Sequence, residues 1–323
     1  MKAIRIEQNG GPEVMRLVDV DVPVPGPNEV RVRHEAIGVN FIDTYHRSGL
    51  YKNTLPHGLG MEAAGVVEAA GANVKRFKEG DRIVYCSGPI GAYAEAHVVN
   101  EARAVKLPDA IAFDIAAASL LKGMTARYLL RKTFRVEQGH VAVIHAAAGG
   151  VGQIAAQWAK HLGAVVIGTV GSDAKAQIVR DLGADHVLVT SRDDIAKRVR
   201  EITSGVGADV VYDGVGKDTW DASLDALRPL GMMVSYGNAS GPPPDINPLV
   251  LSQKGSLFLT RPTLFNYTAT VAQLDETAAD LFDAIAQGAV KIAPPARYAL
   301  ADAAQAHRDL EARRTTGSLV LTP

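Results

Sequence analysis

The chain has almost no cysteine and no long hydrophobic run. Cys86 is the only cysteine among 323 residues, so the chain can form neither an internal disulfide nor a metal site built from several cysteines. No apolar stretch approaches the length of about 20 residues that spans a bilayer. The opening MKAIRIEQNGG also lacks the apolar core of a secretory signal. We therefore expect a soluble, cytoplasmic protein.

An excess of charge of one sign is missing as well. The 34 Lys and Arg residues nearly balance 35 Asp and Glu, which leaves a formal net charge of −1. Proteins that bind nucleic acid or an acidic membrane surface normally carry a basic patch. Neither nucleic acid nor a membrane is therefore an expected partner. The length predicts two domains with a substantial core.

The most informative segment is VAVIHAAAGGVG, residues 141–152, in which an apolar run leads into a glycine-rich turn. The turn has the pattern Ala147-x-Gly149-x-x-Gly152 and a helix is expected directly after it. A second strand, Ala164–Val170, follows at the spacing of a βαβ unit. Glycines in such a turn let the backbone approach a pyrophosphate, to which the helix N-terminus offers free N–H groups. The segment predicts a dinucleotide site.

The end of that second strand indicates which dinucleotide binds. NAD-binding units usually place Asp or Glu about 20 residues after the glycine turn, where it holds the ribose hydroxyls. Here the position falls near Gly171, with Ser172 as a hydrogen-bond donor and Lys175 as a nearby cation. Asp173 is either a ribose-binding acid or, as we favour, the N-cap of a helix over Ala174–Leu182. Lys175 can equally be a solvated helix residue, but the three positions together favour NADPH.

Two different patterns of secondary structure follow one another along the chain. Short β-type segments within residues 1–110 predict a barrel or sandwich: Lys2–Glu7, Glu29–Val39, Gly65–Ala70, Asp81–Cys86 and Ala92–Val99. An alanine-rich helix is expected over Ile115–Lys132, and strands then alternate with helices. The six expected strands are 141–146, 164–170, 185–190, 208–213, 231–236 and 256–260. Such alternation is typical of a doubly wound parallel sheet.

Longer motifs resemble one group of enzymes over essentially the whole chain. They are GGPEVMRL (10–17), AIGVNFIDTYHRSGLY (36–51), GMEAAGVV (60–67), GDRIVY (80–85), AASLLKGMTARYLL (117–130), HAAAGGVG (145–152), LGADHV (182–187) and TGSLVL (316–321). With these motifs the chain resembles the medium-chain dehydrogenase/reductase superfamily, and within it the zinc-free NADPH:quinone oxidoreductases related to zeta-crystallin. The resemblance implies an α/β fold, with a Rossmann doubly wound parallel sheet domain inserted in a GroES-like β-barrel domain. The implied boundaries are 1–122 for the GroES-like catalytic domain, 123–262 for the Rossmann NADPH-binding domain and 263–323 for the return to the catalytic domain.

The resemblance also predicts that no zinc is bound. Zinc-dependent members of the superfamily place a cysteine in the segment matching AIGVN and a histidine in a GHE motif. Asn40 and Met61 stand at these positions here, and neither an amide nor a thioether is a favoured ligand of Zn²⁺. Without a metal that polarises an alcohol, the reaction must suit an acceptor that is already electrophilic, such as a quinone or an α,β-unsaturated carbonyl.

Polar groups that can serve such a reaction lie in NFIDTYHRSGLY, residues 40–51. The resemblance places Asn40, Tyr45 and Tyr51 at the nicotinamide and substrate end, and a tyrosine hydroxyl there can donate to the reduced oxygen. These three are the predicted catalytic residues. Four consecutive residues are expected to contact the cofactor: Asn40, Phe41, Ile42 and Asp43. Two structural interpretations stay open, that Tyr51 packs a loop and that Asp43 caps a helix.

The remaining cofactor contacts are implied by the resemblance, position by position. They are Thr125, Tyr128, Gly149, Gly150, Val151, Gly152, Gly171, Ser172, Lys175, Thr190, Gly216, Asn238, Arg261 and Arg313. Arg261 and Arg313 can equally be ordinary surface arginines. Relatives often carry a tyrosine near the 2′-phosphate where Thr190 stands, and Arg192 is the candidate that replaces it as a charge partner. Lys122 either contacts the cofactor or ties the domains together.

These observations predict an NADPH-dependent quinone oxidoreductase that transfers hydride to a quinone without a metal. An NADPH-dependent enone or alkenal reductase and a nucleotide-binding protein with a structural or RNA-binding role are the alternatives. A homodimer is expected, because the resemblance places the apolar strand Ser256–Thr260 at the edge of the Rossmann sheet, where it can pair with its copy. A monomer is the alternative, in which Arg261-Pro262 and a neighbouring loop protect that edge.

Overall fold

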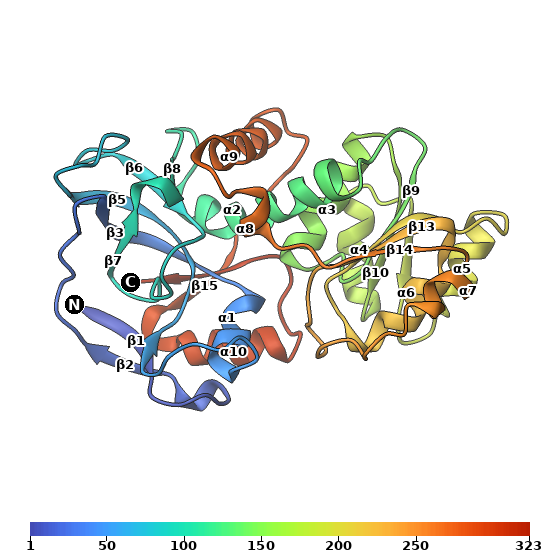
Figure 1. The fold of residues 1–323 in the computed structure, drawn as a ribbon, viewed down its shortest axis with the longest axis horizontal. Helices are drawn as coiled ribbons and strands as arrows, with labels where there is room; N and C mark the ends of the chain where they lie inside the picture. The colour runs from blue at the N-terminus through green and yellow to red at the C-terminus, as the bar shows by residue number, and fades with distance from the viewer. The chain divides into compact units, whose positions relative to one another are not determined.

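The computed structural model describes residues 1–323 and divides the chain into two compact units. The first, called the barrel unit below, consists of Met1–Lys122, Thr268–Phe282 and Ile292–Pro323. The second, called the Rossmann unit, consists of Gly123–Tyr267 and Asp283–Lys291. The chain thus begins and ends in the barrel unit, as the colours in Figure 1 show, and the predicted insertion is confirmed. The sequence-based boundaries at 122/123 and 262/263 remain a prediction.

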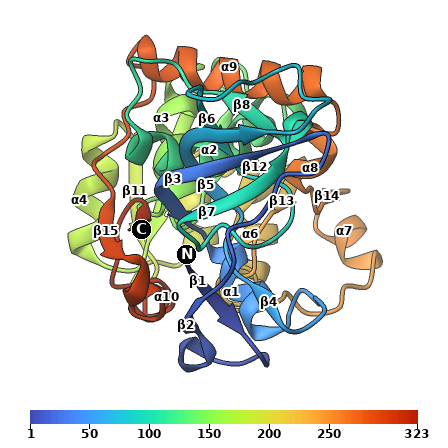
Figure 2. The ribbon, with the colours of Figure 1, turned by 90° about the vertical axis from the view of Figure 1, so that its left-hand side faces the viewer.

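Two sheets make up most of the barrel unit. One has the strand order β2-β1-β4, and the other has the order β15-β16-β3-β5-β6-β8, with β7 also paired to β3 (Figure 2). The strands are β1 (Lys2–Ile6), β2 (Arg16–Asp19), β3 (Glu29–Val39), β4 (His57–Gly58), β5 (Glu62–Ala70), β6 (Arg82–Tyr85), β7 (Ala96–Asn100), β8 (Ala104–Lys106), β15 (Ala296–Ala299) and β16 (Leu319–Thr322). In β3 the alternation of the sequence puts Val30 and Val32 into the core. Leu319 of β16 pairs with Val39, so the C-terminal strand completes this sheet.

The Rossmann unit is built on six parallel strands in the order β11-β10-β9-β12-β13-β14. The strands are β9 (Val141–Ile144), β10 (Val165–Val170), β11 (His186–Val189), β12 (Ala208–Asp213), β13 (Leu227–Ser235) and β14 (Phe258–Thr260). The three central strands β10, β9 and β12 have fully buried Val and Ile in their middle, as strands covered on both faces require. The strand order reverses between β9 and β12, and doubly wound sheets bind ligands beyond the carboxyl ends of the strands at such a point.

Ten α-helices accompany the sheets. They are α1 (Phe41–Ser48), α2 (Phe113–Tyr128), α3 (Gly150–His161), α4 (Asp173–Asp181), α5 (Ile195–Ile202), α6 (Trp220–Asp225), α7 (Leu249–Gln253), α8 (Leu264–Tyr267), α9 (Val271–Ala286) and α10 (Ala303–Glu311). Shorter helical turns cover Pro12–Val14, Glu101–Arg103, Leu129–Thr133, Lys217–Thr219 and Leu300–Asp302. None of the helices combines the length and the apolar composition that a membrane crossing requires.

The structure corrects two of the expected elements. The strand expected over Ala92–Val99 begins only at Ala96, because Tyr93 and Ala94 pair instead with β1 of the smaller sheet. The helix expected over Ile115–Lys132 ends at Tyr128 and continues as one wider turn. All six strands expected for the Rossmann sheet are present, with β13 starting earlier than the sequence indicated.

Candidate active site

The glycine-rich turn joins β9 to α3 by a close backbone approach. Gly149 is the N-cap of α3, Gly150 is its first residue, and no side chain caps the helix. A Cβ on Gly152 would lie 2.4 Å from the carbonyl oxygen of Ala146 and 2.7 Å from the Cα of Ala147. Only glycine therefore lets the helix start this close to the turn. The first-turn N–H groups of α3 are thereby presented at the carboxyl end of β9, a geometry that fits a pyrophosphate.

A buried polar network lies beneath this turn, and sequence reasoning missed it. His145 contacts the Thr169 hydroxyl at 2.8 Å and the Ser223 hydroxyl at 2.9 Å. Ser223 donates in turn to Asp213 at 2.8 Å. Burial lowers the pKa of His145, so the ring is neutral at neutral pH. The only signal in the sequence was that His145 lies near the end of one predicted strand and Asp213 ends another.

Asp213 fixes the turn that contains the predicted cofactor residue Gly216. Its carboxylate accepts hydrogen bonds from the backbone N–H groups of Val215 and Gly216, at 2.7 and 2.9 Å. Gly216 has φ +91, and a Cβ there would lie 2.5 Å from the Gly241 carbonyl and 3.3 Å from the Cα of Asn238. Gly216 and Asn238 are therefore brought together beyond the ends of β12 and β13.

The end of β10 is open, and one expectation about it was wrong. Gly171 is exposed, and a Cβ there would meet nothing within 4 Å. Ser172, not Asp173, is the N-cap of α4, and Asp173 is the first helical residue. The Asp173 carboxylate pairs instead with Arg192 at 2.6 Å, because the side chain at this position points toward the segment after β11. Thr190 lies next to the strand end, since its N–H donates to the Val170 carbonyl at 2.8 Å.

In the barrel unit, Asn40 stands at the start of α1 and is buried. Its side-chain amide donates to Glu62 Oε2 at 2.8 Å, and its backbone N–H donates to Asp43 Oδ2 at 2.8 Å. Asn40 and Asp43 form a capping box. The interpretation that Asp43 caps a helix is therefore confirmed, together with a buried position that a simple surface cap would not have.

Glu62 and Lys122 form a buried pair at the end of this cluster. Lys122 Nζ lies 3.5 Å from Glu62 Oε2, and the side chains are 7% and 0% exposed. Glu62 Oε1 also accepts from the Leu121 N–H at 2.7 Å. Burial raises the pKa of Glu62, and the Lys122 charge opposes that rise. Sequence reasoning missed Glu62, although it directly follows Met61.

Asp43 is a second buried carboxyl of the site with a raised pKa. It is fully buried, Oδ2 accepts from Asn40 and from the Tyr93 hydroxyl at 2.9 Å, and Oδ1 has no hydrogen-bond partner. Burial raises its pKa to about 7, while those hydrogen bonds and the charge of Lys122 oppose the rise. Such a carboxyl changes its protonation near neutral pH and can therefore exchange protons.

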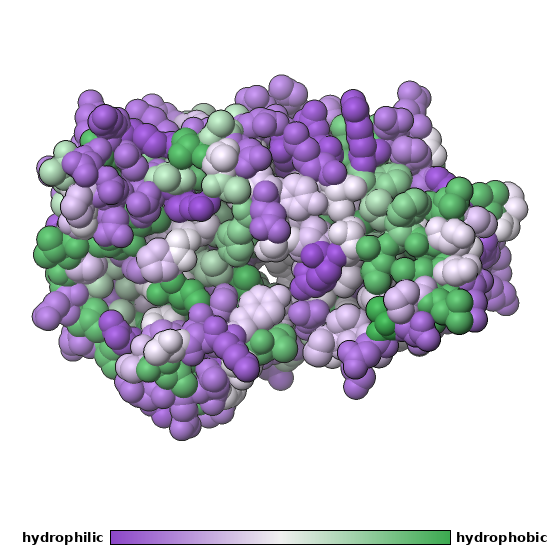
Figure 3. Space-filling model, viewed as in Figure 1, coloured by the Kyte–Doolittle hydropathy of each residue, from purple (hydrophilic) through white to green (hydrophobic).

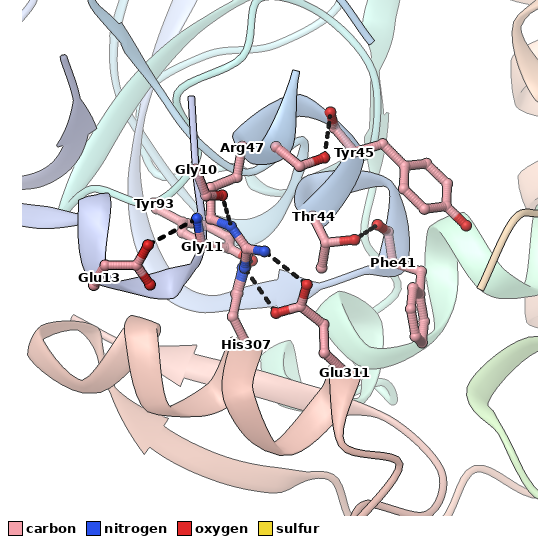
Figure 4. A network of polar contacts seen from close by, with 11 residues as sticks. Gly10, Gly11, Glu13, Phe41, Thr44, Tyr45, Arg47, Tyr93, His307 and Glu311 are labelled. Carbon is pink, nitrogen blue, oxygen red and sulfur yellow. Dashed lines mark hydrogen bonds and ion pairs between the residues drawn. The ribbon is translucent and has the colours of Figure 1, made fainter. Parts of the chain in front are cut away.

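The predicted catalytic tyrosines contact each other at the C-terminal end of α1. The rings of Tyr45 and Tyr51 meet edge to face, with centroids 5.3 Å apart, and Tyr51 also packs on His46 at 5.6 Å. The Tyr51 N–H donates to the Tyr45 carbonyl at 3.0 Å. Phe41 and Tyr45 extend from the same helix with centroids 6.4 Å apart (Figure 4).

The other predicted contacts are spread over the two units. Thr125 and Tyr128 are buried on α2, and Tyr128 stacks on Tyr267 with a centroid distance of 4.5 Å. Arg261 is exposed directly after β14. Arg313 is exposed after α10 and has φ +57.

Two family models match the chain in succession. Residues 26–109 match the alcohol dehydrogenase GroES-like domain, and residues 150–283 match the zinc-binding dehydrogenase domain. A quinone oxidoreductase of Pseudomonas aeruginosa is 54% identical over 323 residues, which cover 100% of this chain and 99% of that protein. The chain belongs to the quinone oxidoreductase family. The predicted place in the medium-chain dehydrogenase/reductase superfamily is confirmed.

Two further members of the superfamily are similar over their whole length. The structure of Escherichia coli quinone oxidoreductase complexed with NADPH is 48% identical, with a TM-score of 0.98 and coverage of 100% of both chains. A 2-haloacrylate reductase of a Burkholderia species is 45% identical over 325 residues, with 98% of each chain covered. The predicted fold, a Rossmann domain inserted in a GroES-like domain, is confirmed.

Proposed function

We propose that the protein is an NADPH-dependent quinone oxidoreductase that works without a metal. The observation that carries this proposal is the full-length similarity to quinone oxidoreductases, one of which is solved with NADPH. The cradle left by Gly149 and Gly152 fits the pyrophosphate of such a cofactor. When bound, NADPH supplies the hydride, and the side chains described below orient the acceptor.

In this proposal the Rossmann unit holds the adenosine and pyrophosphate part of NADPH. Backbone N–H groups of Gly149, Gly150, Val151 and Gly152 bind the pyrophosphate. Gly171 leaves room for a 2′-phosphate, because a Cβ there would meet nothing within 4 Å and the nearby Asp173 carboxylate is paired with Arg192. The other cofactor contacts of this unit are Thr125, Tyr128, Ser172, Lys175, Thr190, Gly216, Asn238 and Arg261.

The barrel unit provides the groups for the acceptor and the nicotinamide end. Phe41, Ile42, Asp43 and Arg313 complete the proposed cofactor contacts. Asn40 is held by two hydrogen bonds, so its position is fixed before any ligand binds. The hydroxyl of Tyr45 or Tyr51 donates to the oxygen of the reduced acceptor and stabilises its developing charge.

Metal independence follows from the residues at the ligand positions. The Asn40 amide donates a hydrogen bond to Glu62. Met61, which precedes Glu62 in the chain, is buried, and its thioether is a weak ligand for Zn²⁺. A quinone accepts hydride without prior polarisation by a metal, because its ring is already electron-poor. Hydride transfer to a quinone therefore needs no Zn²⁺, and Asn40 and Met61 provide no good ligands for it.

Reduction of an α,β-unsaturated carbonyl is the second candidate. The similarity to 2-haloacrylate reductase favours it, because an acrylate also takes hydride at a conjugated carbon. A steady-state assay of NADPH oxidation across quinones and enones separates the two candidates. We expect faster turnover with quinones. Turnover confined to enones would assign the protein to the second class, and no acceptor-dependent oxidation in either series would reject both.

We also propose a homodimer formed through the free edge of the Rossmann sheet. β14 is the last strand in the order, and Phe258 on it is 56% exposed. Exposed Leu249 lies nearby in sequence on α7, and hydrophobic residues gather where α7 and β14 lie (Figure 3). Leu257 of the same segment is already buried within the unit, so strand pairing is not needed to cover it. The cytoplasmic location stays a prediction from the sequence.

A further inference from the structure

A continuous hydrogen-bonded array crosses the barrel unit and ends on Asp43. Arg47 Nη1 lies 2.9 Å from His307 Nδ1, and His307 Nε2 lies 3.0 Å from the Tyr93 hydroxyl. That hydroxyl reaches Asp43 Oδ2 at 2.9 Å. At the other end, both carboxylate oxygens of Glu311 accept from Arg47, at 2.6 and 3.0 Å (Figure 4).

The direction of every hydrogen bond in this array is fixed. Arginine only donates, so His307 Nδ1 must accept. Burial lowers the pKa of His307 to about 3, so the ring is neutral and its one N–H is on Nε2. Nε2–H therefore donates to the oxygen of Tyr93, which leaves the Tyr93 O–H to donate to Asp43. Arg47 itself is immobilised, because it is 2% exposed and its Nε donates to the Gly10 carbonyl at 3.0 Å.

The array therefore presents one hydrogen bond to Asp43 and leaves its second oxygen open. Tyr93 is a neutral hydrogen-bond donor to this carboxyl. The charged groups that act on it are Lys122 from α2 and Glu62 from β5. Asp43 Oδ1 is completely buried and has no partner in the protein. A buried carboxylate oxygen without a partner is costly, and a bound molecule or a proton relieves that cost.

We propose that Asp43 carries the proton of quinone reduction on Oδ1, and that Tyr93, His307 and Arg47 are positioning residues that fix it. The inference rests on the proposed function. A quinone that has accepted a hydride, with its two electrons, still needs one proton to become a hydroquinone. The O–H bond of protonated Asp43 breaks, the proton joins the quinone oxygen, and the carboxylate regains a proton from water.

The geometry also explains why the array does not pass protons itself. The end at Arg47 cannot give up a proton at any accessible pH, so the proton on His307 Nε2 cannot be replaced through Nδ1. Tyr93 therefore stabilises the carboxylate form of Asp43 without draining its proton. Together with burial, this keeps both protonation states of Asp43 accessible near neutral pH, as a general acid requires.

Tyr93→Phe tests the positioning role, and Tyr85→Phe is the matched control. Tyr85 is also a fully buried tyrosine whose hydroxyl contacts a histidine, His34 Nε2, at 2.9 Å, but it contacts no carboxylate. We expect Tyr93→Phe to raise the pKa of Asp43 by about one to two pH units, because a hydrogen bond to a charged group is lost. Tyr85→Phe should leave that pKa unchanged. The measurement is a ¹³C NMR titration of aspartate carboxyls, with the Asp43 signal assigned by its loss in Asp43→Asn.

The NMR titration does not need activity, so it separates this inference from the proposed function. An Asp43 that titrates near 4, or one that Tyr93→Phe does not move, would overturn the positioning role. If no quinone supports NADPH oxidation by the wild-type protein, the proposed function fails. The titration would still decide whether Tyr93 shifts the pKa of Asp43.

The pH profile of kcat/KM for a quinone tests the proton-carrying role. The wild-type rate should fall as the pH rises through the pKa of Asp43, and Tyr93→Phe should move that fall to higher pH by the same shift as in the titration. Asp43→Asn should remove the step and lower the rate about 100-fold, the usual contribution of a general acid. A shifted titration with an unshifted rate profile would overturn the proton-carrying role.

Discussion

The side-chain amide of Asn40 donates to Glu62 Oε2 over 2.8 Å, within a buried cluster of the barrel unit. This bond fixes the amide orientation, since the nitrogen has to face the carboxylate. It also uses the position at which zinc-dependent members of the superfamily place a thiolate. Lys122 Nζ, 3.5 Å from the same oxygen, adds a positive charge to the cluster. The positive charge of Lys122 thus balances the negative charge of Glu62, and no metal ion is needed for that purpose.

From this arrangement we expect activity to survive exhaustive chelation. Metal binding would break the bond between Asn40 and Glu62, and beside the one carboxylate of Glu62, which is already paired with Lys122, it would offer the ion only an amide and a thioether. Elemental analysis of the purified protein should find no stoichiometric zinc before or after chelation. One tightly held zinc per chain, lost together with quinone reduction, would contradict the expectation.

A second prediction concerns the choice between NADPH and NADH. Lys175→Ala should weaken NADPH binding about tenfold or more and leave NADH binding unchanged, because only NADPH offers a phosphate to the ammonium group. The control is Lys197→Ala, which removes an exposed lysine of α5 in the same unit and should leave the binding of both cofactors unchanged. Fluorescence titration with both cofactors is the measurement. Equal weakening of both cofactors by Lys175→Ala would remove Lys175 from the 2′-phosphate site.

The sequence predicted the elements of this fold better than it predicted the contacts of the site. The Rossmann strands were found because buried parallel strands are apolar runs at regular spacing. Asp43 was expected only as a cap or a cofactor contact, since its partners Tyr93 and His307 lie 50 and 264 residues further along the chain. Periodicity does not report such distant side-chain pairs. Ala92–Val99 was misjudged for a similar reason, because strand pairing with β1 is a tertiary choice.

A third prediction tests the glycine turn. Gly152→Ala should lower both stability and NADPH affinity, because the new Cβ would lie 2.4 Å from the backbone oxygen of Ala146, which cannot move without shifting the turn. Overpacking of this kind typically costs about 1–3 kcal/mol. Gly171→Ala is the control for stability, since a Cβ there meets nothing within 4 Å. Urea unfolding of both variants checks this, and an unchanged midpoint for Gly152→Ala would show that the turn relaxes freely.

A fourth prediction concerns assembly. Phe258→Glu should shift the protein from dimer toward monomer, because it places a charge on the exposed face of the edge strand. Val206→Glu is the matched control, since Val206 is 57% exposed in the same unit but lies before β12, away from β14 in the strand order. Light scattering at micromolar concentration measures the mass. A wild-type mass near that of one chain would rule the dimer out, and equal effects of the two variants would place the interface elsewhere.

The last prediction is the pH dependence of stability that Asp43 imposes. Its pKa is raised from 3.8 to about 7 in the folded protein, so the folded state binds this proton more tightly than the unfolded state. The stabilisation is complete below pH 3.8 and is lost as the pH rises to about 7, a total of about 4 kcal/mol for a shift of this size.

Asp43→Asn removes this term, which makes a difference measurement possible. The free energy of unfolding of the wild type minus that of Asp43→Asn should fall as the pH rises across this window. Buried His34 and His307, whose pKa values are lowered to about 3, give stability that rises with pH, but they are present in both proteins and cancel. Asp309→Asn is the control with the opposite sign, because hydrogen bonds from Gln305 and other neighbours lower the pKa of Asp309. Urea unfolding at several pH values gives each curve, and a flat difference for Asp43→Asn would mean that Asp43 ionises as it does in the unfolded chain.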